Sequence, residues 1–578
     1  MAEPALRQRK NGTPADEQKA NGTTKPNVVG GKGKGSPSKY ATGLIGLVAF
    51  VFAALLYRSD YFLRQHVAPE LETTTRLPAD LQRRDAVVQA FKHAWSGYER
   101  DAMGDDQYHP ISKKGTNLTD AGGIGYTIVD AIDTMQIMGL TEEYTRARAW
   151  IEKSLSFDRN GKFNTFEITI RILGGLLSAY HLCSGDPLYL EKATELADRL
   201  LPAFETPFGL PATDVNLGLR KAVEDANNVA STAEVGSVQL ELRYLSHLTD
   251  NDEYWDKAEN VMKTIKAATL PSGLATIYMG TESGQFLMSQ IRLGSRGDSF
   301  YEYLLKQYLQ TNQTETGYRE LYENAMTAIH KTLLRTTPAK NLTFFVELVP
   351  QRGRRGKIDW HAEPKQDHLV CFLGGNLMLG ATTAGADKHS VSVPPMDDEL
   401  SPTGQRDWKT GMDVIETCIE TYKGTATGLS PEIVHFRTSD DGLGSTAKTD
   451  WYIKGARGSS KEPPYDARYI LRPETIESLF VAYRLTGDEK YRQYGWDIFQ
   501  AIEKYCRVET GGYASILNVD DVNSKLEDRM ETFMLSETLK YLYLLFSDES
   551  VLPLDKYVFN TEAHPLPIFT PQSRRPFT

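Results

Sequence analysis

Carboxylates stand inside apolar segments of this sequence that are otherwise typical of buried helices. They are Glu167, Glu234, Asp298, Glu474, Glu477 and Glu537, and the arginines near them in sequence are Arg171, Arg296 and Arg472. Taken singly, such an acid is usually a helix-capping residue or one that interacts favourably with the helix dipole. Several such acids in one chain favour a functional site, because a buried charge destabilises a folded protein unless it is paired or serves binding or catalysis.

Acids of this kind have the chemistry of glycoside hydrolysis if the fold brings them around one cavity. Hydrolysis of a glycosidic bond needs a carboxylic acid opposite a carboxylate, and clustered acids shift one another's pKa values. A cavity lined with acids, arginines and aromatic rings suits a neutral, polyhydroxylated substrate. These residues predict a carbohydrate-active, hydrolytic protein, but they select neither the sugar nor the linkage.

One histidine, His368, lies in the apolar segment DHLVCFLGGNLMLG. It is either a ligand or proton carrier of the site, or a core histidine that is hydrogen-bonded near a helix start. No other cluster of His and Cys in the sequence has the spacing of a zinc site.

Helices must position these side chains, since apolar residues recur at three- and four-residue steps from about Leu81 onward. Four segments repeat one order: a leucine, a small polar turn with acidic residues, an aromatic and a charged amphipathic helix. They start at Leu140, Leu182, Leu248 and Leu485. Each predicts one helix ending, an N-cap of Thr, Ser or Asp, and a partner helix returning antiparallel. Because the first helix of each pair is the more apolar, we expect an all-α toroid in which an outer ring of helices wraps a buried inner ring.

Other segments interrupt the helical pattern. Strand-like alternation is confined to short pieces such as residues 342–349, and residues 381–408 and 437–467 have the polar, Gly-containing composition of surface insertions. After residue 80, no linker-like segment divides the sequence into separate domains. Residues 81–578 are therefore predicted to form one catalytic barrel.

The chain has 578 residues, of which 40% are hydrophobic and 24% charged, and its formal net charge is -11. This composition excludes whole-chain disorder. The acidic excess argues against nucleic acid as the main partner, because phosphate binding needs clustered Lys and Arg. Residues 1–40 differ from the rest: they hold eight basic and three acidic residues, and so carry +5 while the remainder carries about -16.

A charge-free apolar segment at residues 40–57 follows this basic region. Its length just suffices for a membrane span, although a buried core helix or a cleaved signal peptide has a similar pattern. The polar leader before it favours an uncleaved signal anchor, and the positive-inside rule places residues 1–39 in the cytosol. We expect a single-pass type II membrane protein with a lumenal stem at residues 58–80 and a lumenal barrel.

A lumenal location has two chemical consequences. Three Asn-x-Thr sequons become candidates for N-glycosylation, those of Asn117, Asn312 and Asn341. A lumen is also oxidising, so Cys371 and Cys418 can pair, although spacing alone does not fix the connectivity of the 4 cysteines.

Longer motifs carry a resemblance to a known family. They include IVDAIDTM at 128–135, FEITIRILGGLLSAYHL at 166–182, GDSFYEYLLKQ at 297–307, RPETIESLF at 472–480 and YVFNTEAHPLPI at 557–568. From residue 93 to 571 the sequence closely resembles glycoside hydrolase family 47, the class I α-1,2-mannosidases, and within it the fungal enzymes of the endoplasmic reticulum. The resemblance implies an (α/α)7 barrel, dependence on calcium (Ca2+) and inversion at the anomeric carbon.

Position-by-position matching to these motifs implies roles for single residues. Glu167 matches the proton donor, thought to act through a water, Glu474 matches the general base, and Asp298 matches a third catalytic carboxylate that competes for the acid role. The calcium site is expected from Thr561 as the direct protein ligand and, through waters, from Glu477, Glu537 and Glu562. Glycan contacts are expected from Arg171, Glu234, Arg296, His368, Arg472 and Phe533, and a disulfide from Cys371 and Cys418.

The residue at position 296 bears on specificity within the family. An arginine there, as in this chain, is typical of reticulum enzymes that convert a nine-mannose N-glycan to a single eight-mannose isomer. Golgi-type relatives carry a smaller apolar residue and trim more broadly. The resemblance implies narrow trimming in the endoplasmic reticulum membrane. The alternatives are a Golgi-type mannosidase, a lectin-like degradation factor that binds mannose glycans without efficient cleavage, and a membrane-tethered scaffold.

Overall fold

The computed structural model describes residues 76–578, except 224, 226, 271–272, 354–356, 389, 440, 442–448, 456–461, 572–573 and 575. Residues Thr75–Thr578 form one compact unit, and Leu77 is already buried in it. The predicted cytosolic tail, the membrane anchor and most of the stem lie outside the described residues. Within the described part of the chain, no helix combines the length and the apolar character needed to cross a bilayer.

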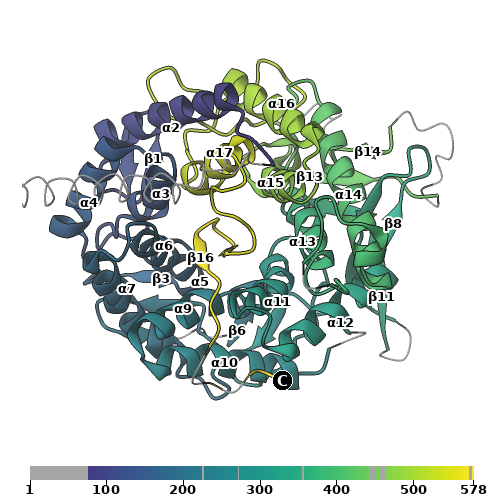
Figure 1. Ribbon diagram of the computed structural model, residues 1–578, viewed down its shortest axis with the longest axis horizontal. Coiled ribbons are helices and arrows are strands. Elements are labelled where there is room, and N and C mark those ends of the chain that lie inside the picture. The colour runs from purple at the N-terminus through teal and green to yellow at the C-terminus, as the bar shows by residue number, and fades with distance from the viewer. Residues whose placement is uncertain are drawn as a thin grey trace, which may run out of the picture. The chain divides into compact units, whose positions relative to one another are not determined.

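Seven helix pairs, counted over the described residues, close into a ring (Figure 1). The inner helices are α3 (Tyr126–Ile137), α6 (Gly174–Leu182), α9 (Gln239–Thr249), α11 (Asp298–Gln310), α13 (Phe372–Ala381), α15 (Glu474–Thr486) and α17 (Leu539–Phe546). The outer helices that pack on them, in the same order, are α4 (Thr141–Ser154), α7 (Pro187–Leu200), α10 (Asp252–Ala267), α12 (Thr316–Thr332), α14 (Pro402–Lys423), α16 (Glu489–Tyr505) and α2 (Leu81–Ala102). This is the expected (α/α)7 barrel, and the α17–α2 pair closes it.

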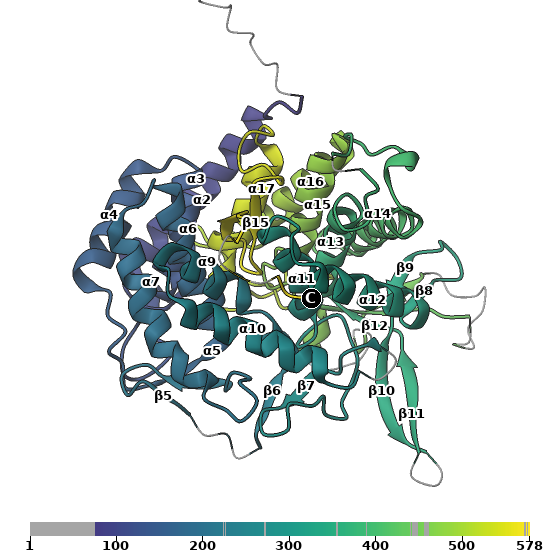
Figure 2. The same ribbon diagram turned by 60° about the horizontal axis from the view of Figure 1, so that its bottom comes forward.

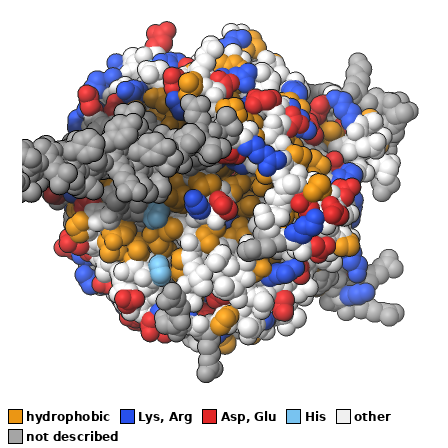
Figure 3. Space-filling view, in the orientation of Figure 1, with side chains coloured by type: hydrophobic (Ala, Val, Ile, Leu, Met, Phe, Trp, Pro, Cys, Tyr) orange, Lys and Arg blue, Asp and Glu red, His pale blue; other side chains and the backbone are white. Residues whose placement is uncertain are grey.

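The two rings differ in burial, as the sequence pattern predicts. Every residue of α11 from Ser299 to Gln310 is buried, Lys306 included. By contrast, α16 buries one stripe that contains Tyr491 and Ile498. An inner helix is surrounded by other helices, whereas an outer helix faces solvent on one side. On the molecular face in Figure 3, hydrophobic side chains gather over the middle of the ring and charged ones lie mostly around them.

The four repeated segments are turns from an inner to an outer helix, which confirms the prediction. The side chains of Asp186, Asn251 and Asp488 cap α7, α10 and α16. Two turns depart from the expected N-cap of Thr, Ser or Asp: α10 is capped by Asn251, and α4 follows Leu140, whose side chain has no hydrogen-bond acceptor. Acidic residues in the first turn of α4, among them Glu142, interact favourably with the helix dipole instead.

Short strands lead into the elements that carry predicted site residues. β3 (Lys162–Asn164), β6 (Val229–Ser231) and β12 (Lys365–Asp367) run directly into α5 (Thr165–Ile168), α8 (Thr232–Gly236) and η5 (His368–Cys371). Each lies in a small antiparallel sheet. β3 pairs with β4 (Asp214–Asn216), which pairs in turn with β5 (Lys221–Ala222), and β6 pairs with β7 (Tyr278–Gly280). β12 pairs with β13 (Ile433–Phe436), which pairs in turn with β14 (Trp451–Tyr452). The pairing fixes the direction in which each site helix starts.

The strand-like alternation at residues 342–349 is confirmed as β9 (Thr343–Phe345) and the start of β10 (Glu347–Arg352). β9 pairs with β8 (Leu334–Thr336), and β10 pairs with β11 (Ile358–Glu363) in a hairpin that projects from the ring (Figure 2). A further short pair joins β1 (Gln107–His109) and β2 (Lys114–Thr116).

The first predicted insertion, residues 381–408, is shorter than expected. Its last residues belong to α14, which begins at Pro402. Ser401 caps this helix by accepting a hydrogen bond from the N–H of Gly404, and proline at the first helical position is pre-organised for a helix. These start signals outweigh the polar composition that suggested a loop.

A hairpin of β15 (Tyr557–Phe559) and β16 (Pro565–Pro567) lies inside the ring, where Figure 1 shows it in yellow. β15 contacts α11 and β16 contacts α6. The turn of the hairpin carries Thr561 and Glu562. The hairpin therefore brings two residues predicted for the calcium site into the barrel.

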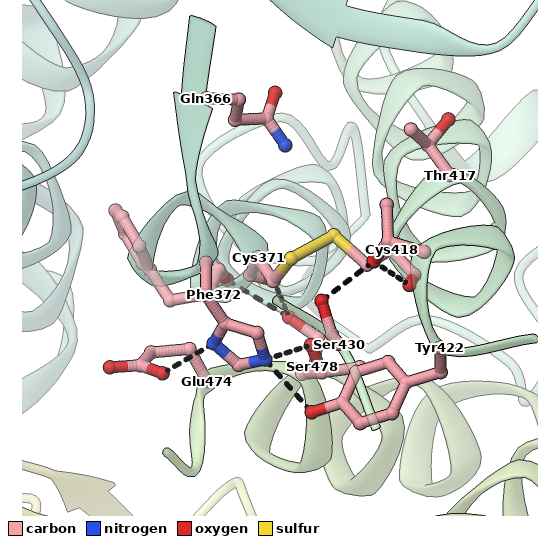
Figure 4. Close-up of a disulfide and its surroundings, with 12 residues drawn as sticks. Gln366, Cys371, Phe372, Thr417, Cys418, Tyr422, Ser430, Glu474 and Ser478 are labelled. Atoms are coloured by element: carbon pink, nitrogen blue, oxygen red, sulfur yellow. Dashed lines mark hydrogen bonds and ion pairs between the residues drawn. A yellow bond between two sulfur atoms is a disulfide. The ribbon is translucent and has the colours of Figure 1, made fainter. Parts of the chain in front are cut away.

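Cys371 and Cys418 form the predicted disulfide, with their Cα atoms 6.1 Å apart. The bond joins the end of η5 to α14, and Figure 4 shows it next to Ser478 of α15, whose hydroxyl donates to the carbonyl of Cys371. Cys183 and Cys506 are free thiols. The sequon asparagines are all exposed: Asn117, Asn312 and Asn341.

We expect the Cys371→Ser/Cys418→Ser double variant to be less stable than the wild type. The disulfide spans 47 residues, and release of a loop of that length destabilises the folded state by about 4 kcal/mol. Urea unfolding followed by circular dichroism measures the change. Cys183→Ser, which removes a free thiol, is the matched control and should leave the midpoint unchanged. Equal midpoints for the double variant and the wild type would contradict the prediction.

Candidate active site

A cavity of about 310 Å³ lies where α5, α8, α11 and α15 begin. The predicted site residues that line it are Glu167, Arg171, Glu234, Arg296, Asp298, Arg472, Glu474, Phe533, Glu537, Thr561 and Glu562. Asp298 and Glu474 are the first residues of α11 and α15. Acids that are far apart in sequence meet because these helices start around one cavity.

Glu167 is oriented by Arg171, four residues later. Asn164 caps α5 by accepting a hydrogen bond from the N–H of Glu167 at 2.9 Å, and the chain continues in a π-helical turn, η1 (Thr169–Leu173). This turn places Nε of Arg171 2.9 Å from Oε2 of Glu167. The side chain of Glu167 is 40% exposed, which leaves it accessible to a ligand in the cavity.

Arg171 connects this acid to the rest of the site. Its Nη1 lies 2.6 Å from Oε2 of Glu562 in the β15–β16 turn and 3.6 Å from Oδ2 of Asp130 on α3. Its guanidinium lies over the ring of Phe533, 5.8 Å from the ring centre. Burial disfavours the charged form, but Glu562 and the other neighbouring acids outweigh burial and raise the pKa of Arg171.

Glu474 is held as a carboxylate by His368 and Arg472. Nδ1 of His368 lies 3.1 Å from Oε2 of Glu474, and Nη1 of Arg472 lies 3.8 Å from its Oε1. Burial favours the neutral acid, but the hydrogen bond from His368 and the charge of Arg472 outweigh it and lower the pKa of Glu474. This is the ionisation state that a general base needs.

His368 does not line the cavity, in contrast to the expected glycan contact. Its Nε2 lies 2.8 Å from the hydroxyl of Tyr422 and 3.3 Å from Oγ1 of Thr475, while its Nδ1 faces Glu474. Figure 4 shows Tyr422 and Glu474 near the disulfide. Because both ring nitrogens are occupied, His368 orients Glu474 and has no nitrogen left for a sugar.

Arg472 pairs most closely with Glu432, a residue that the sequence analysis did not single out. Nε of Arg472 lies 2.8 Å and 3.0 Å from the two carboxylate oxygens of Glu432, and its Nη2 lies 2.5 Å from one of them. A two-point contact of this kind fixes the plane of the guanidinium. The only signal in the sequence was an acid within the apolar segment GLSPEIVHF.

Asp298 has the opposite protonation preference to Glu474. Burial raises the pKa of Asp298 to about 7, and repulsion from Glu302 and Glu474 adds to the effect. The N–H of Ser299 donates to its Oδ1 at 2.9 Å and only partly offsets burial. One cavity therefore holds an acid that keeps its proton up to about pH 7 and a carboxylate that loses its proton at lower pH.

Glu234 combines a structural role with a place in the cavity. It forms a capping box with Ser231: the N–H of Glu234 donates to Oγ of Ser231 at 3.1 Å, and the N–H of Ser231 donates to Oε2 of Glu234 at 3.4 Å. Burial raises the pKa of Glu234. The capping explanation thus holds for this acid, and it lines the cavity as well.

Arg296 lines the cavity and is exposed. Its guanidinium carbon lies 5.5 Å from the centre of the Tyr278 ring. Its backbone has a φ of 73°, in the left-handed region that residues with a side chain rarely adopt. The surrounding loop thus holds a charged side chain available to a ligand.

Three of the four residues predicted for calcium line the cavity: Glu537, Thr561 and Glu562. Burial raises the pKa of Glu562 to about 8 and that of Glu537 well above its usual range, and the two carboxyls share a hydrogen bond. Glu477 lies instead against Lys306, at 3.2 Å from its Nζ, and lines a separate cavity of about 20 Å³. Burial raises the pKa of Glu477 to about 7.

The described lining of the main cavity is acidic. It contains six carboxylates and three arginines, which would give a net charge of -3 if all were ionised. Within the described residues, no three His, Cys, Asp or Glu side chains are grouped as ligands of one ion. A cation here would need other oxygen ligands, such as a hydroxyl, a carbonyl, waters or the substrate.

Known proteins resemble this chain in both sequence and structure. The family model for glycosyl hydrolase family 47 matches residues 90–568. A mannosyl-oligosaccharide 1,2-alpha-mannosidase from Candida albicans is 43% identical over 494 residues, which cover 84% of this chain and 83% of that protein. The endoplasmic reticulum mannosyl-oligosaccharide 1,2-alpha-mannosidase of Schizosaccharomyces pombe is 42% identical over 502 residues, with coverages of 85% and 91%. The solved structure of the alpha-1,2-mannosidase from Trichoderma reesei has a TM-score of 0.74 and 30% identity, covering 85% of this chain and 100% of that one. The chain therefore belongs to glycosyl hydrolase family 47.

Proposed function

We propose that this protein hydrolyses terminal α-1,2-linked mannose from high-mannose N-glycans. The names of its relatives from C. albicans and S. pombe specify this linkage. The observation that carries the proposal is the contrast between Asp298 and Glu474 in one cavity: burial raises the pKa of Asp298 to about 7, whereas His368 and Arg472 outweigh burial and lower the pKa of Glu474. Glycoside hydrolysis by two carboxyl groups requires such a pair.

In the proposed mechanism Glu474 accepts a proton from a water molecule, and the oxygen of that water attacks the anomeric carbon of the terminal mannose. A carboxylic acid donates its proton to the glycosidic oxygen, which leaves with the electron pair of the broken bond. Asp298 holds such a proton below about pH 7, and the more exposed Glu167 is placed to pass one through a water. A single displacement from the side opposite the leaving oxygen inverts the anomeric carbon.

A calcium ion is part of the proposal because the donor chemistry fits one. Thr561 offers a hydroxyl and a carbonyl oxygen, and calcium takes roughly six to eight oxygen ligands. Glu537 and Glu562 share a hydrogen bond beside Thr561, and a bound cation would favour the ionised form of both carboxyls. Thr561 would hold the ion directly, and Glu537, Glu562 and Glu477 would hold its waters. Bound there, calcium supplies an electrostatic template for sugar hydroxyls.

The cellular location is proposed on three grounds. A basic region precedes the charge-free segment at 40–57, which favours a type II anchor with residues 1–39 in the cytosol. The disulfide of Cys371 and Cys418 fits an oxidising lumen. The S. pombe relative is named for the endoplasmic reticulum, and we propose the membrane of that compartment for this chain.

A Golgi-type mannosidase of broader trimming is the second candidate. Arg296 favours the narrow activity, because an exposed guanidinium beside the cavity is able to hold one arm of the glycan while the other is cut. We therefore propose that trimming of a nine-mannose glycan stops at one eight-mannose isomer. A lectin-like factor fits less well, since Glu167, Asp298 and Glu474 all line one cavity.

The direct test is incubation of the full chain with a nine-mannose N-glycan, with and without a calcium chelator. We expect release of one mannose, loss of release on chelation, and recovery when calcium is returned. Glu474→Gln removes the base and should lower kcat by roughly 10²–10⁴-fold while glycan binding remains measurable. Glu142→Gln, at an exposed glutamate of α4, is the control. No mannose release with calcium present would overturn the enzyme assignment.

The pH profile of kcat/KM should fall on its alkaline side near pH 7. The pKa of Asp298 is about 7, so this acid loses its proton as the pH rises through that value, and the charged groups that face it are the acids Glu302, Glu474 and Asp367. Glu474, whose pKa is lowered, stays ionised throughout this range. In Asp298→Asn the residual activity should lack the alkaline limb. If kcat/KM of Asp298→Asn still falls near pH 7, that fall arises from another acid.

Arg296→Leu should broaden trimming. Loss of the guanidinium removes a charged hydrogen bond worth about 1.5–3 kcal/mol of glycan affinity but leaves the three catalytic carboxylates in place. Mass spectrometry of the products over time should then show glycans with fewer than eight mannoses. Arg335→Leu, at an exposed arginine of β8, should give the wild-type product. A single eight-mannose product from Arg296→Leu would contradict the prediction.

A further inference from the structure

The turn between β15 and β16 is held by a buried asparagine that uses all of its hydrogen-bonding capacity. Oδ1 of Asn560 accepts from the N–H groups of Glu562 at 2.9 Å and His564 at 2.8 Å. Its Nδ2 donates to the carbonyl of Ile170 at 2.8 Å and to Oε1 of Glu241 at 2.7 Å. An amide side chain offers two donor hydrogens and two acceptor lone pairs, so Asn560 fixes both the turn and its position against the inner ring.

A buried ammonium holds the other end of the turn. Nζ of Lys540, on α17, donates to the carbonyl of Ala563 at 2.8 Å and to Oδ2 of Asp133 on α3 at 2.9 Å. The same carboxylate oxygen lies 2.8 Å from Nδ1 of His564 and accepts from Ser178 at 2.9 Å. The side chains of Lys540, Asp133 and His564 are fully buried. A buried ion pair contributes little net stability compared with apolar packing, so its use here points to a need for a defined position.

The backbone of the turn shows that these contacts oppose its local preference. Ala563 has a φ of 59°, a left-handed conformation that is unfavourable for a residue with a Cβ atom. Such a conformation persists where the surrounding structure imposes it. Here the carbonyl of Ala563 is held by Lys540, and the N–H groups on both sides are held by Asn560.

The contacts leave the oxygens of Thr561 available. The N–H of Thr561 donates to the hydroxyl of Tyr303 at 3.3 Å. Among the described residues, no hydrogen bond reaches the hydroxyl or the carbonyl oxygen of Thr561, and the residue lines the main cavity. Lys540, Asp133 and Asn560 do not line that cavity.

We infer that Lys540, Asp133 and Asn560 are positioning residues that hold the 560–564 turn in shape without calcium, so that the two oxygens of Thr561 form a ready-made site for the ion. This inference rests on the calcium part of the proposed function. A preformed site binds more tightly than one that must be ordered on binding, because ordering the turn would oppose binding.

The wild-type chain provides the first test. Hydrogen–deuterium exchange of the full chain is measured over residues 557–567 in calcium and in excess chelator. We expect the amides of Glu562 and His564 to be protected in both conditions. Exchange of these amides at the rate of an unfolded peptide in the chelator would overturn the inference, even if the enzyme binds calcium and cleaves glycan.

The second test is the calcium affinity of Lys540→Met, measured by titration calorimetry on protein whose folding is checked by circular dichroism. Loss of a side chain that orients a ligand typically weakens metal binding roughly 10–100-fold, and we expect a change of that size. Arg243→Met is the matched control, because Arg243 is also a buried cation on an inner helix. It pairs with Glu315 at 2.6 Å and bonds the hydroxyl of Tyr318, and neither partner belongs to the 560–564 turn. It should lose stability but keep the wild-type affinity.

The double variant Asp133→Asn/Lys540→Met removes both charges and provides the measurement if Lys540→Met does not fold. It should show the same weakening. Wild-type affinity in either folded Lys540 variant, or an equal loss in Arg243→Met, would overturn the inference. Failure of the wild type to bind calcium would overturn the calcium assignment itself, which the glycan incubation with chelator tests separately.

Discussion

The ion pair between Arg171 and Glu562 is the contact on which the site depends. It joins the inner ring to the central hairpin at 2.6 Å, and both side chains are nearly buried. The same guanidinium orients Glu167. Replacing Arg171 would remove the cation that Glu167, Asp130 and Glu562 share, and breaking a buried pair typically costs about 3–5 kcal/mol. The position of the candidate acid and that of the Thr561 turn are thus coupled through one side chain.

The surplus of negative charge around the cavity has a chemical use. With too few arginines to balance all the carboxylates, each acid takes the protonation state that its own neighbours allow. Burial favours the neutral form of both Asp298 and Glu474; nearby acids add to this effect at Asp298, whereas His368 and Arg472 outweigh it at Glu474. The difference between acid and base therefore arises from the arrangement of neighbours rather than from residue type.

Local features of the structure could be predicted from the sequence, and features set by distant partners could not. The four repeated turns and the apolar inner helices follow from periodicity and turn residues within short segments. Five of the six cavity acids were visible as charges in apolar segments, and Glu562 was expected only from the resemblance. By contrast, nothing near Thr561 marks it as a metal ligand, and only the resemblance to a family pointed to it. Its environment is built by Asn560, Tyr303 and Glu562, whose own partners lie on other helices.

The errors have the same origin. The partners of His368 could not be predicted either: Tyr422, far along the chain, lies at its second nitrogen, and His368 is outside the cavity lining. Glu432 was overlooked because its partner Arg472 lies in another segment. The predicted insertion at residues 381–408 extends too far, because its polar composition resembles a loop although Ser401 and Pro402 are start signals for the helix α14.

The central hairpin also sets the order of events during synthesis. Arg171 and Glu562 are 391 residues apart along the chain, and at the usual speed of translation that separation corresponds to roughly 20–80 s. Throughout this interval Glu167 and Arg171 already exist, but the turn that carries Thr561 does not. A nascent chain would thus remain without a complete site until translation has passed the last strand of the hairpin.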